Sequence, residues 1–251
     1  MIEPAHDEWF SPAPPRILAH RGLALGCLEN SIPAFRSAAA HGVRHMETDV
    51  RATRDGVAVL WHDEHLGAFD GTDDLVAELS FAQLRDRARE GRAIPSVAEA
   101  LEALPDLRFN LDVKAIEAAA PLAAAVRAAG AEERVLVCSF SDARLAAIRR
   151  LLPECASSAS AGRLGRAFVA LEMGRTEAAR RALGGADAIQ VPEREAGITL
   201  VSPVRIERWK RVVREIHVWT VNDPDEMRRL WDAGVDGIVT DRADLAVEAL
   251  A

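Results

Sequence analysis

The sequence lacks several features that would assign it to particular classes of protein. None of its apolar runs approaches the ~20 residues of a membrane-spanning helix, so we expect no stable membrane insertion. Cys27, Cys138 and Cys155 are odd in number and lack Cys-x-x-Cys spacing, so neither a disulfide framework nor a zinc site is indicated. A formal net charge of -8 argues against general binding to nucleic acid.

Residues 1–15 have neither the basic flank nor the apolar core of a secretory signal. We interpret this acidic, proline-rich stretch as an N-terminal arm and expect a cytoplasmic protein. Lysine is scarce, because Lys114 and Lys210 are the only two in the chain. A lysine that falls at a candidate site, as Lys114 does, is therefore not readily explained by chance. Nothing in the sequence indicates an oligomeric state.

Short strands alternate with helical segments through most of the chain, and no linker divides it. We expect one domain over residues 16–251, an α/β fold closed as a (β/α)8 TIM barrel, because barrels of this kind are built from eight such units. Residues 168–171 are a further candidate strand. The eight predicted strands lie near residues 17, 44, 107, 134, 155, 187, 216 and 237.

Residues 43–63 are predicted to form a β-hairpin. Asp55-Gly56 is a strong hairpin turn signal, and positions whose numbers sum to about 110 would face one another across antiparallel strands. Glu47 and Asp49 share one face because strand side chains alternate. The pairing places His62 beside Thr48 and Asp49.

The segment after this hairpin, residues 64–95, is predicted to be a short insertion. It holds a loop rich in glycine and aspartate and a helix that begins at a capping box, Ser80-x-x-Gln83. A second capping box, Ser96-x-x-Glu99, starts the next helix. The insertion is well placed to cover a site.

Polar side chains gather at the carboxyl ends of the predicted strands, where TIM barrels carry their active sites. Three inward carboxylates would repel one another unless a cation lay among them, and oxygen ligands favour Mg2+ or Ca2+. Two histidines beside an arginine and a lysine suit acid-base chemistry on a phosphate ester. The candidates are His20, Arg21, Glu47, Asp49, His62, Asp112, Lys114 and Trp219.

The order of several motifs resembles that of the glycerophosphodiester phosphodiesterases over most of the chain. This resemblance implies the barrel and hydrolysis of a small-molecule glycerophosphodiester to an alcohol and glycerol 3-phosphate. The motifs are His20-Arg21-Gly22, Glu29-Asn30, Glu47-x-Asp49, Thr53-x-Asp55-Gly56, His62-Asp63, Leu111-Asp112-Val113-Lys114, Ser139-Phe140, Trp219-Thr220-Val221-Asn222 and Asp236-Gly237-x-x-Thr240-Asp241.

The resemblance also implies roles for individual residues. It implies that one divalent cation, Mg2+ or Ca2+, is held by Glu47, Asp49 and Asp112. His20 and His62 would form the acid-base pair, and Arg21 and Lys114 would contact the phosphate.

Two positions depart from the family pattern. Asp112 stands where the family usually has the longer glutamate, so this ligand would reach the metal through water or from a shifted position. Residues 64–74 lack the usual Arg-Thr-Thr sequence. The resemblance therefore bears more on reaction class than on substrate preference.

Each candidate also has a structural interpretation. Arg21 and Lys114 can simply pair with carboxylates, and Trp219 suits core packing as well as a wall for the glycerol moiety. An isolated histidine is more often a surface or structural residue, and we interpret five of them in this way: His6, His41, His45, His65 and His217.

The sequence leaves several functional alternatives open. A related lipid phosphodiesterase, like a lysophospholipase D, would use an internal hydroxyl and release a cyclic phosphate. A catalytically silent barrel would bind a phosphodiester without turnover. Either histidine, His20 or His62, can be the acid and the other the base.

Overall fold

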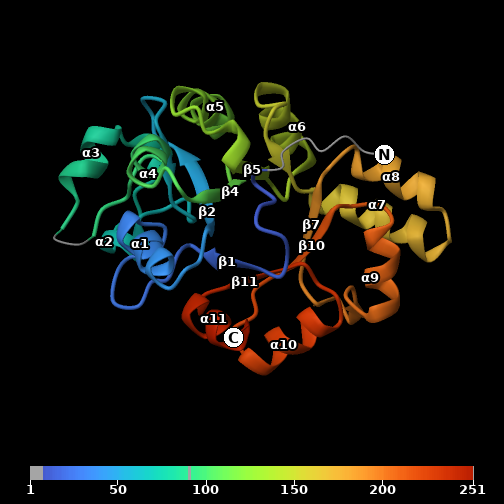
Figure 1. Cartoon of the computed structure of the whole chain (residues 1–251). Helices are drawn as coiled ribbons and strands as arrows, with labels where there is room; N and C mark the ends of the chain where they lie inside the picture. Colours follow the sequence, from blue (N-terminus) through green and yellow to red (C-terminus); the bar gives the residue numbers. More distant parts are fainter. Residues whose placement is uncertain (1–7, 90–91, 251) are drawn as a thin grey trace.

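Eight parallel strands form a nearly closed barrel in the computed structural model, which describes residues 8–89 and 92–250 (Figure 1). Their order is β6-β5-β4-β2-β1-β11-β10-β7. A parallel bridge between Ser158 and Ala188 joins its two ends. The strands are β1 (Arg16–His20), β2 (His45–Ala52), β4 (Arg108–Val113), β5 (Val135–Cys138), β6 (Ala156–Ser157), β7 (Ala188–Val191), β10 (Glu215–Val218) and β11 (Gly237–Thr240).

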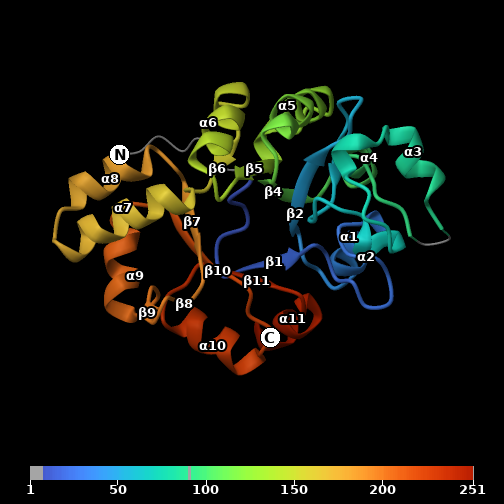
Figure 2. The same ribbon diagram turned by 180° about the vertical axis from the view of Figure 1, so that it is seen from behind.

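Helices surround the strands when the molecule is viewed from either side (Figure 1, Figure 2). Among the described residues, no helix is both long enough and apolar enough to cross a lipid bilayer. The α-helices are α1 (Ile32–Ala40), α2 (Gly67–Asp70), α3 (Phe81–Asp86), α4 (Val97–Ala103), α5 (Ala119–Ala128), α6 (Asp142–Leu151), α7 (Ala161–Glu172), α8 (Thr176–Leu183), α9 (Pro203–Lys210), α10 (Pro224–Asp232) and α11 (Ala243–Leu250). Short 3-10 turns occupy Val76–Glu78, Ile116–Ala118 and Glu132–Arg134.

The barrel prediction is confirmed, and a strand lies near each of the eight expected positions. The candidate strand at residues 168–171 is wrong, because these residues lie inside α7. A short apolar run fits a strand or a buried helix equally well. In α7 the buried residues Ala167, Ala170 and Leu171 recur at helical spacing and face the core.

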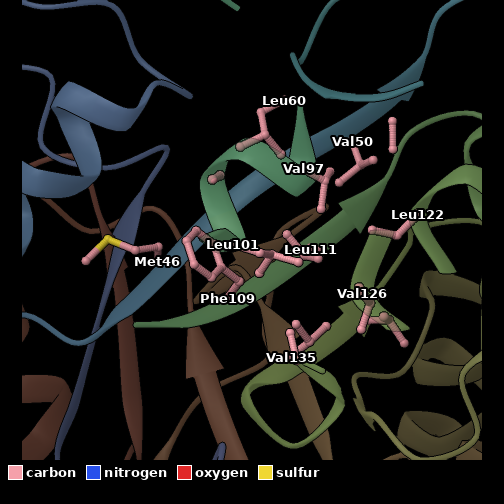
Figure 3. Close-up of a cluster of buried hydrophobic side chains, with 14 of the residues drawn as sticks. Met46, Val50, Leu60, Val97, Leu101, Phe109, Leu111, Leu122, Val126 and Val135 are labelled. Carbon is pink, nitrogen blue, oxygen red and sulfur yellow. The ribbon is translucent and has the colours of Figure 1, made fainter. Parts of the chain in front are cut away.

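The main apolar core lies between the barrel and its outer helices (Figure 3). Met46 and Val50 on β2 point into it with Phe109 and Leu111 on β4, and Leu101 on α4 packs against them. These side chains alternate with Glu47, Asp49, Asn110 and Asp112, which face the other way. Side chains alternate along a strand, so burying the apolar residues of β2 and β4 in the core turns their polar residues toward the opposite face.

The hairpin formed by β2 and β3 (Ala58–Leu60) has the expected register. Val50 faces Leu60, and Ala52 faces Ala58, so paired positions sum to 110. The Trp61 N–H donates to the Asp49 carbonyl at 3.0 Å. This hydrogen bond extends the pairing of the two strands to Trp61. The next residue, His62, therefore lies beside Asp49.

The insertion has a small apolar cluster of its own beside β3, where α2, α3 and α4 lie on one side of the barrel (Figure 1). Phe69, Val76 and Leu84 pack there against Trp61. Both predicted capping boxes, at Ser80 and Ser96, are present. Residues 90–91 lie outside the described part. No described residue of 64–95 lines the cavity, and the covering role of the insertion stays a prediction.

The described part of the N-terminal arm closes the amino-terminal end of the barrel. Trp9 is fully buried among barrel residues such as Leu136, Ala156 and Ala188. Its indole N–H donates to the Phe109 carbonyl at 3.3 Å. The division into an arm at 1–15 and one domain at 16–251 stays a prediction, and residues 1–7, with His6, lie outside the described residues.

Beside Trp9, a buried ionic cluster spans the same end of the barrel. Arg16 binds Glu215 through two hydrogen bonds, the shorter at 2.6 Å, and the His217 ring lies 2.9 Å from the same carboxylate. Burial would raise the pKa of Glu215, but hydrogen bonds from His217 and Arg16 outweigh it and lower that pKa to about 2. His45 and His217 thus occupy structural positions, as expected.

Candidate active site

All eight predicted site residues line one cavity of about 670 Å³ at the carboxyl ends of the barrel strands. Strand register brings several of them together: Glu47 on β2 is paired with His20 on β1, and Asp49 is paired with Asp112 on β4. Because the strands are parallel, residues at the same level of neighbouring strands point into the same space. Lys114 follows β4 directly.

The turn after β1 holds Arg21 in an unusual backbone conformation. Arg21 has φ of 54° and Gly22 has φ of 85°, both in the left-handed region that side chains disfavour. A Cβ on Gly22 would lie 2.7 Å from the Ala34 backbone. Glycine therefore lets α1 approach the strand end, beside Arg21, which lines the cavity.

Asp49 is the central carboxylate of the site and is almost fully buried. Its Oδ1 lies 2.9 Å from the Lys114 ammonium, and its Oδ2 lies 3.0 Å from Arg21 Nε, without hydrogen-bond geometry. Asn30 donates to Oδ2 at 3.1 Å. Burial would raise the pKa of Asp49, but the charges of Lys114 and Arg21 outweigh it and lower that pKa.

The Lys114 ammonium bridges two carboxylates, because it also donates to Asp112 Oδ2 at 2.7 Å. Burial would lower the pKa of Lys114, but Asp112 and Asp49 raise it well above its ordinary value. Burial raises the pKa of Asp112, and Lys114 opposes this shift. The lysine therefore stays charged and neutralises part of the acidic cluster.

The cost of burying Glu47 is offset less by nearby positive charges than the cost of burying Asp49 or Asp112. Burial and the negative charge of Asp49 raise the pKa of Glu47 to about 8. Its Oε2 lies 3.8 Å from His20 Nε2, which is too long for a hydrogen bond. Glu47 Oε2 is therefore a buried acceptor without a partner.

Two further buried oxygens in the cavity lack hydrogen-bond partners: Asp112 Oδ1 and Asn110 Oδ1. Buried acceptors of this kind normally find a donor or an ion. An all-oxygen set suits a hard cation such as Mg2+ or Ca2+. Within residues 8–89 and 92–250, no three acidic, histidine or cysteine side chains converge closely enough to form a metal site. Asp49 is instead paired with Lys114 and Arg21.

His20 is held between two carboxylates. Its Nδ1 lies 2.6 Å from Asp241 Oδ1, and Asn222 donates to Asp241 Oδ2 at 2.8 Å. Burial would lower the pKa of His20, but the hydrogen bond with Asp241 and the charge of Glu47 outweigh it and raise that pKa. The Nε2 atom lies on the side of Glu47.

His62 approaches the cavity from the end of the hairpin and is more open to solvent. Its side chain is 40% exposed, and its Nδ1 lies 2.7 Å from Asp63 Oδ1. Arg51 donates to the His62 carbonyl at 2.8 Å and steadies this part of the chain. Each histidine thus has a carboxylate on Nδ1, which leaves Nε2 available for proton transfer.

The structure adds positioning residues that the sequence reasoning left without roles. Asn30 joins Thr48 to Asp49, because its carbonyl oxygen accepts from the Thr48 hydroxyl at 2.7 Å. Asp241 orients His20. Both residues belong to motifs named above. Asn30 follows Glu29, and Asp241 follows the last strand; the sequence gives no other sign of their positioning roles.

Comparisons with known proteins agree with this geometry. The profile of the glycerophosphoryl diester phosphodiesterase family matches residues 20–245. The chain belongs to this family. It is thus grouped with phosphoric diester hydrolases, and the sequence resemblance is confirmed.

Individual relatives of the family match along nearly the whole chain. A Mycobacterium tuberculosis protein named "Probable glycerophosphodiester phosphodiesterase 2" is 41% identical over 93% of this chain and 89% of its own length. A glycerophosphodiester phosphodiesterase of Caldanaerobacter subterraneus is 26% identical over 90% of this chain and 93% of its own length.

A solved structure supports the fold. An Oleispira antarctica phosphodiesterase in complex with the product sn-glycerol-3-phosphate superimposes with a TM-score of 0.77 at 20% identity. The match covers 96% of this chain and 98% of that protein. At this identity the likeness bears on the barrel alone.

Proposed function

We propose that this chain hydrolyses glycerophosphodiesters to an alcohol and glycerol 3-phosphate, with one divalent cation and two histidines. The observation that carries the proposal is the convergence of His20 and His62 on a cavity that also holds Arg21, Lys114 and three carboxylates. In the reaction, water forms a new bond to phosphorus while the bond from phosphorus to the alcohol oxygen breaks.

Glu47, Asp49 and Asp112 are the residues that would hold the cation, Mg2+ or Ca2+. When bound, such an ion stabilises negative charge on the phosphoryl oxygens. The partnerless oxygens of Glu47 and Asp112 support this assignment, and Asn110 supplies a third such oxygen that the sequence reasoning did not consider.

The two histidines would move the protons of the reaction. One accepts a proton from the attacking water or hydroxyl, and the other donates a proton to the leaving alkoxide. Asp241 favours the charged form of His20, so His20 is suited to donate. His62 is more exposed and is suited to receive a proton from water.

Arg21 and Lys114 would bind the non-bridging phosphate oxygens. Both line the cavity and lie within 3.0 Å of Asp49, which supports this role. Trp219 would form part of the wall for the substrate, because it lines the cavity together with Phe140, whose ring lies 5.7 Å away between centroids.

One assay tests the proposal. Glycerophosphocholine, glycerophosphoethanolamine and a lysophospholipid are incubated with the protein in Mg2+, in Ca2+ and after chelation. We expect hydrolysis that chelation abolishes. A cyclic phosphate product would instead favour the lysophospholipase D-like alternative, and tight binding without turnover in every metal would favour the silent barrel.

A further inference from the structure

A second cavity, of about 390 Å³, lies between α6, α7 and the end of α8, three helices that lie next to one another in both views (Figure 1, Figure 2). Within the described part of the chain, no residue lines both this cavity and that of the candidate active site. Helix α7 contributes to both, because Arg163 lines the second cavity whereas Leu164 and Gly165 line the first. The second cavity is therefore a separate space with its own chemistry.

Three arginines line this second cavity, which we call the arginine cavity: Arg149, Arg150 and Arg163. Among its described lining residues, Asp187 is the one carboxylate. The chain as a whole has a formal net charge of -8, so this excess of positive charge is local. A concave space lined by an excess of one charge attracts ions of the opposite sign.

The charge of the arginine cavity is only partly neutralised. Asp187 is engaged elsewhere, because its Oδ2 accepts from the Ser157 backbone N–H at 2.8 Å. Burial and the positive charge of Arg163 lower the pKa of Arg149, and the charge of Asp187 offsets them only in part. By contrast, Arg166 on the same helix as Arg163 has its own carboxylate, that of Asp142, at 2.9 Å. The arginine cavity thus holds guanidinium groups that repel one another.

These arginines also have a structural role, which leaves part of their hydrogen-bonding capacity unused. Arg149 donates to the Gly184 carbonyl at 2.8 Å and to the Gly185 carbonyl at 3.2 Å. Arg163 donates to the Leu183 carbonyl at 3.3 Å. Positive side chains are favourable there, at the carboxyl end of α8. A guanidinium group has more N–H donors than these carbonyls use, and the buried Arg163 Nε has no hydrogen-bond partner. Donors therefore remain for a ligand.

Glycine at position 184 makes room for the Arg163 side chain. Gly184 has φ of 63°, a left-handed conformation that glycine adopts without strain. A Cβ at this position would collide with the Arg163 guanidinium. Because Arg149 donates to the carbonyl of the same glycine, the bare backbone at position 184 brings both guanidinium groups to one turn of the chain.

We infer that the arginine cavity binds the phosphate group of a small anion, either inorganic phosphate or a phosphate monoester such as glycerol 3-phosphate. The planar guanidinium fork matches phosphate, since two of its N–H groups can donate to two phosphate oxygens. A bound phosphate would offset the repulsion between Arg149 and Arg163 and accept hydrogen bonds from their unused donors. The inference is independent of the proposed function, because it concerns a different cavity.

Isothermal titration calorimetry with inorganic phosphate, after chelation and at constant ionic strength, measures this binding. Arg163→Gln should weaken it by about tenfold or more, the usual effect of losing a hydrogen bond to a charged group. Arg150 is exposed, so Arg150→Gln should fold normally and weaken binding by about threefold or more. Asp187→Asn keeps an acceptor for Ser157 but removes the negative charge. It should therefore bind phosphate more tightly, by about threefold or more.

Two further variants serve as controls. Arg166→Gln makes the same charge change on the same helix, and Arg166 is exposed and absent from the cavity lining. Its affinity for phosphate should stay within about twofold of the wild type. Arg21→Gln separates the two cavities, because Arg21 lines the candidate active site. Phosphate binding that persists in Arg21→Gln and is lost in Arg163→Gln belongs to the arginine cavity. Circular dichroism and melting temperature check that each variant is folded.

A second titration, with glycerol 3-phosphate, distinguishes the two sources of the phosphate group. Tighter binding of glycerol 3-phosphate than of inorganic phosphate would identify a phosphate monoester as the ligand, and the reverse order would identify the free ion. Either result supports the inference.

Three results would overturn the inference: no binding of either anion to the wild type, equal affinities in the wild type, Arg150→Gln and Arg163→Gln, or a loss of binding that Arg166→Gln reproduces. None of these measurements depends on hydrolysis of a glycerophosphodiester. Failure of the inference would therefore leave the proposed function in place, and failure of the proposed function would leave the inference in place.

Discussion

The Nδ1 atom of His20 lies 2.6 Å from Oδ1 of Asp241, so a residue at the end of the first barrel strand is held by one that directly follows the last. We expect Asp241→Asn to lower kcat by about 10–100-fold, as loss of an orienting carboxylate commonly does, with KM changed by less than about twofold. Steady-state kinetics on glycerophosphocholine measure both.

The control for this variant is Asp225→Asn. Asp225 is an exposed carboxylate on α10 that pairs with Arg228, and it does not line the cavity. It should keep wild-type kcat and KM. A loss confined to KM in Asp241→Asn would show that the carboxylate serves substrate binding rather than the orientation of His20.

The two candidate acid-base residues should each be essential. We expect His20→Ala and His62→Ala to lower kcat by about 100–10,000-fold, the usual contribution of general acid-base catalysis, with unchanged far-ultraviolet circular dichroism. The exposed His41 on the surface supplies the control His41→Ala, which should retain activity. Full turnover by either cavity variant would contradict its assignment.

Lys114 should control both the stability of the metal-free protein and its response to cations. Lys114→Met leaves the buried Asp49 and Asp112 without their shared partner, which should cost about 3–5 kcal/mol of unfolding free energy. Added Mg2+ or Ca2+ should raise the melting temperature of this variant more than that of the wild type.

The second lysine offers a matched control. Lys210 pairs with Asp236 at 3.1 Å and is partly exposed, so Lys210→Met should cost only about 0–1 kcal/mol. Its response to cations should equal that of the wild type. The same melting shift in Lys114→Met and wild type would indicate that the lysine does not compete with a cation for the carboxylates.

The protein should lose stability at acidic pH because of two ionisable groups buried at the amino-terminal end of the barrel, His45 and Glu215. Burial and the charge of Arg16 lower the pKa of His45 to about 3, whereas its ordinary value is 6.5. As pH falls below 6.5, the unfolded chain takes up a proton that the folded protein refuses, so stability is lost between 6.5 and 3. The loss approaches about 1.4 kcal/mol for each pH unit inside that window.

Glu215 adds to this loss at lower pH. Its lowered pKa of about 2 means that its stabilising contribution is present above its ordinary value of 4.5 and is lost as pH falls from 4.5 toward 2. Chemical unfolding at several pH values measures both effects. His45→Gln should show a shallower decline between pH 6 and 5 than the wild type or His41→Gln, and equal slopes would refute the role of His45.

The sequence predicted the barrel because its strands are short, apolar and separated by clear helical stops. The hairpin register followed from Asp55-Gly56 alone, since a tight turn leaves only one pairing of the two arms. Periodicity failed at residues 168–171, where a run of four apolar residues fits two structures and only the packing of α7 on the barrel decides between them.

The sequence did not predict the role of a site residue where that role depends on a partner distant in the chain. Strand alternation placed Glu47 and Asp49 on one face, but nothing in the sequence pairs His20 with Asp241, which lies 221 positions away. The apolar part of the cavity lining was not predicted, because Leu164 and Leu200 resemble ordinary core residues in the sequence. They line the cavity together, from α7 and from the segment that follows β9 (Ile198–Thr199).

The pairing of β1 with β11 makes activity depend on the synthesis of β11. Arg16 is paired with Gly237 and Ala19 with Thr240, so β1 gains its second neighbour only after β11 has been synthesised. Contacts this distant in sequence form slowly. A nascent chain that stops before β11 would have most of its helices but neither a closed barrel nor the partner of His20, so unfinished chains would be catalytically inert.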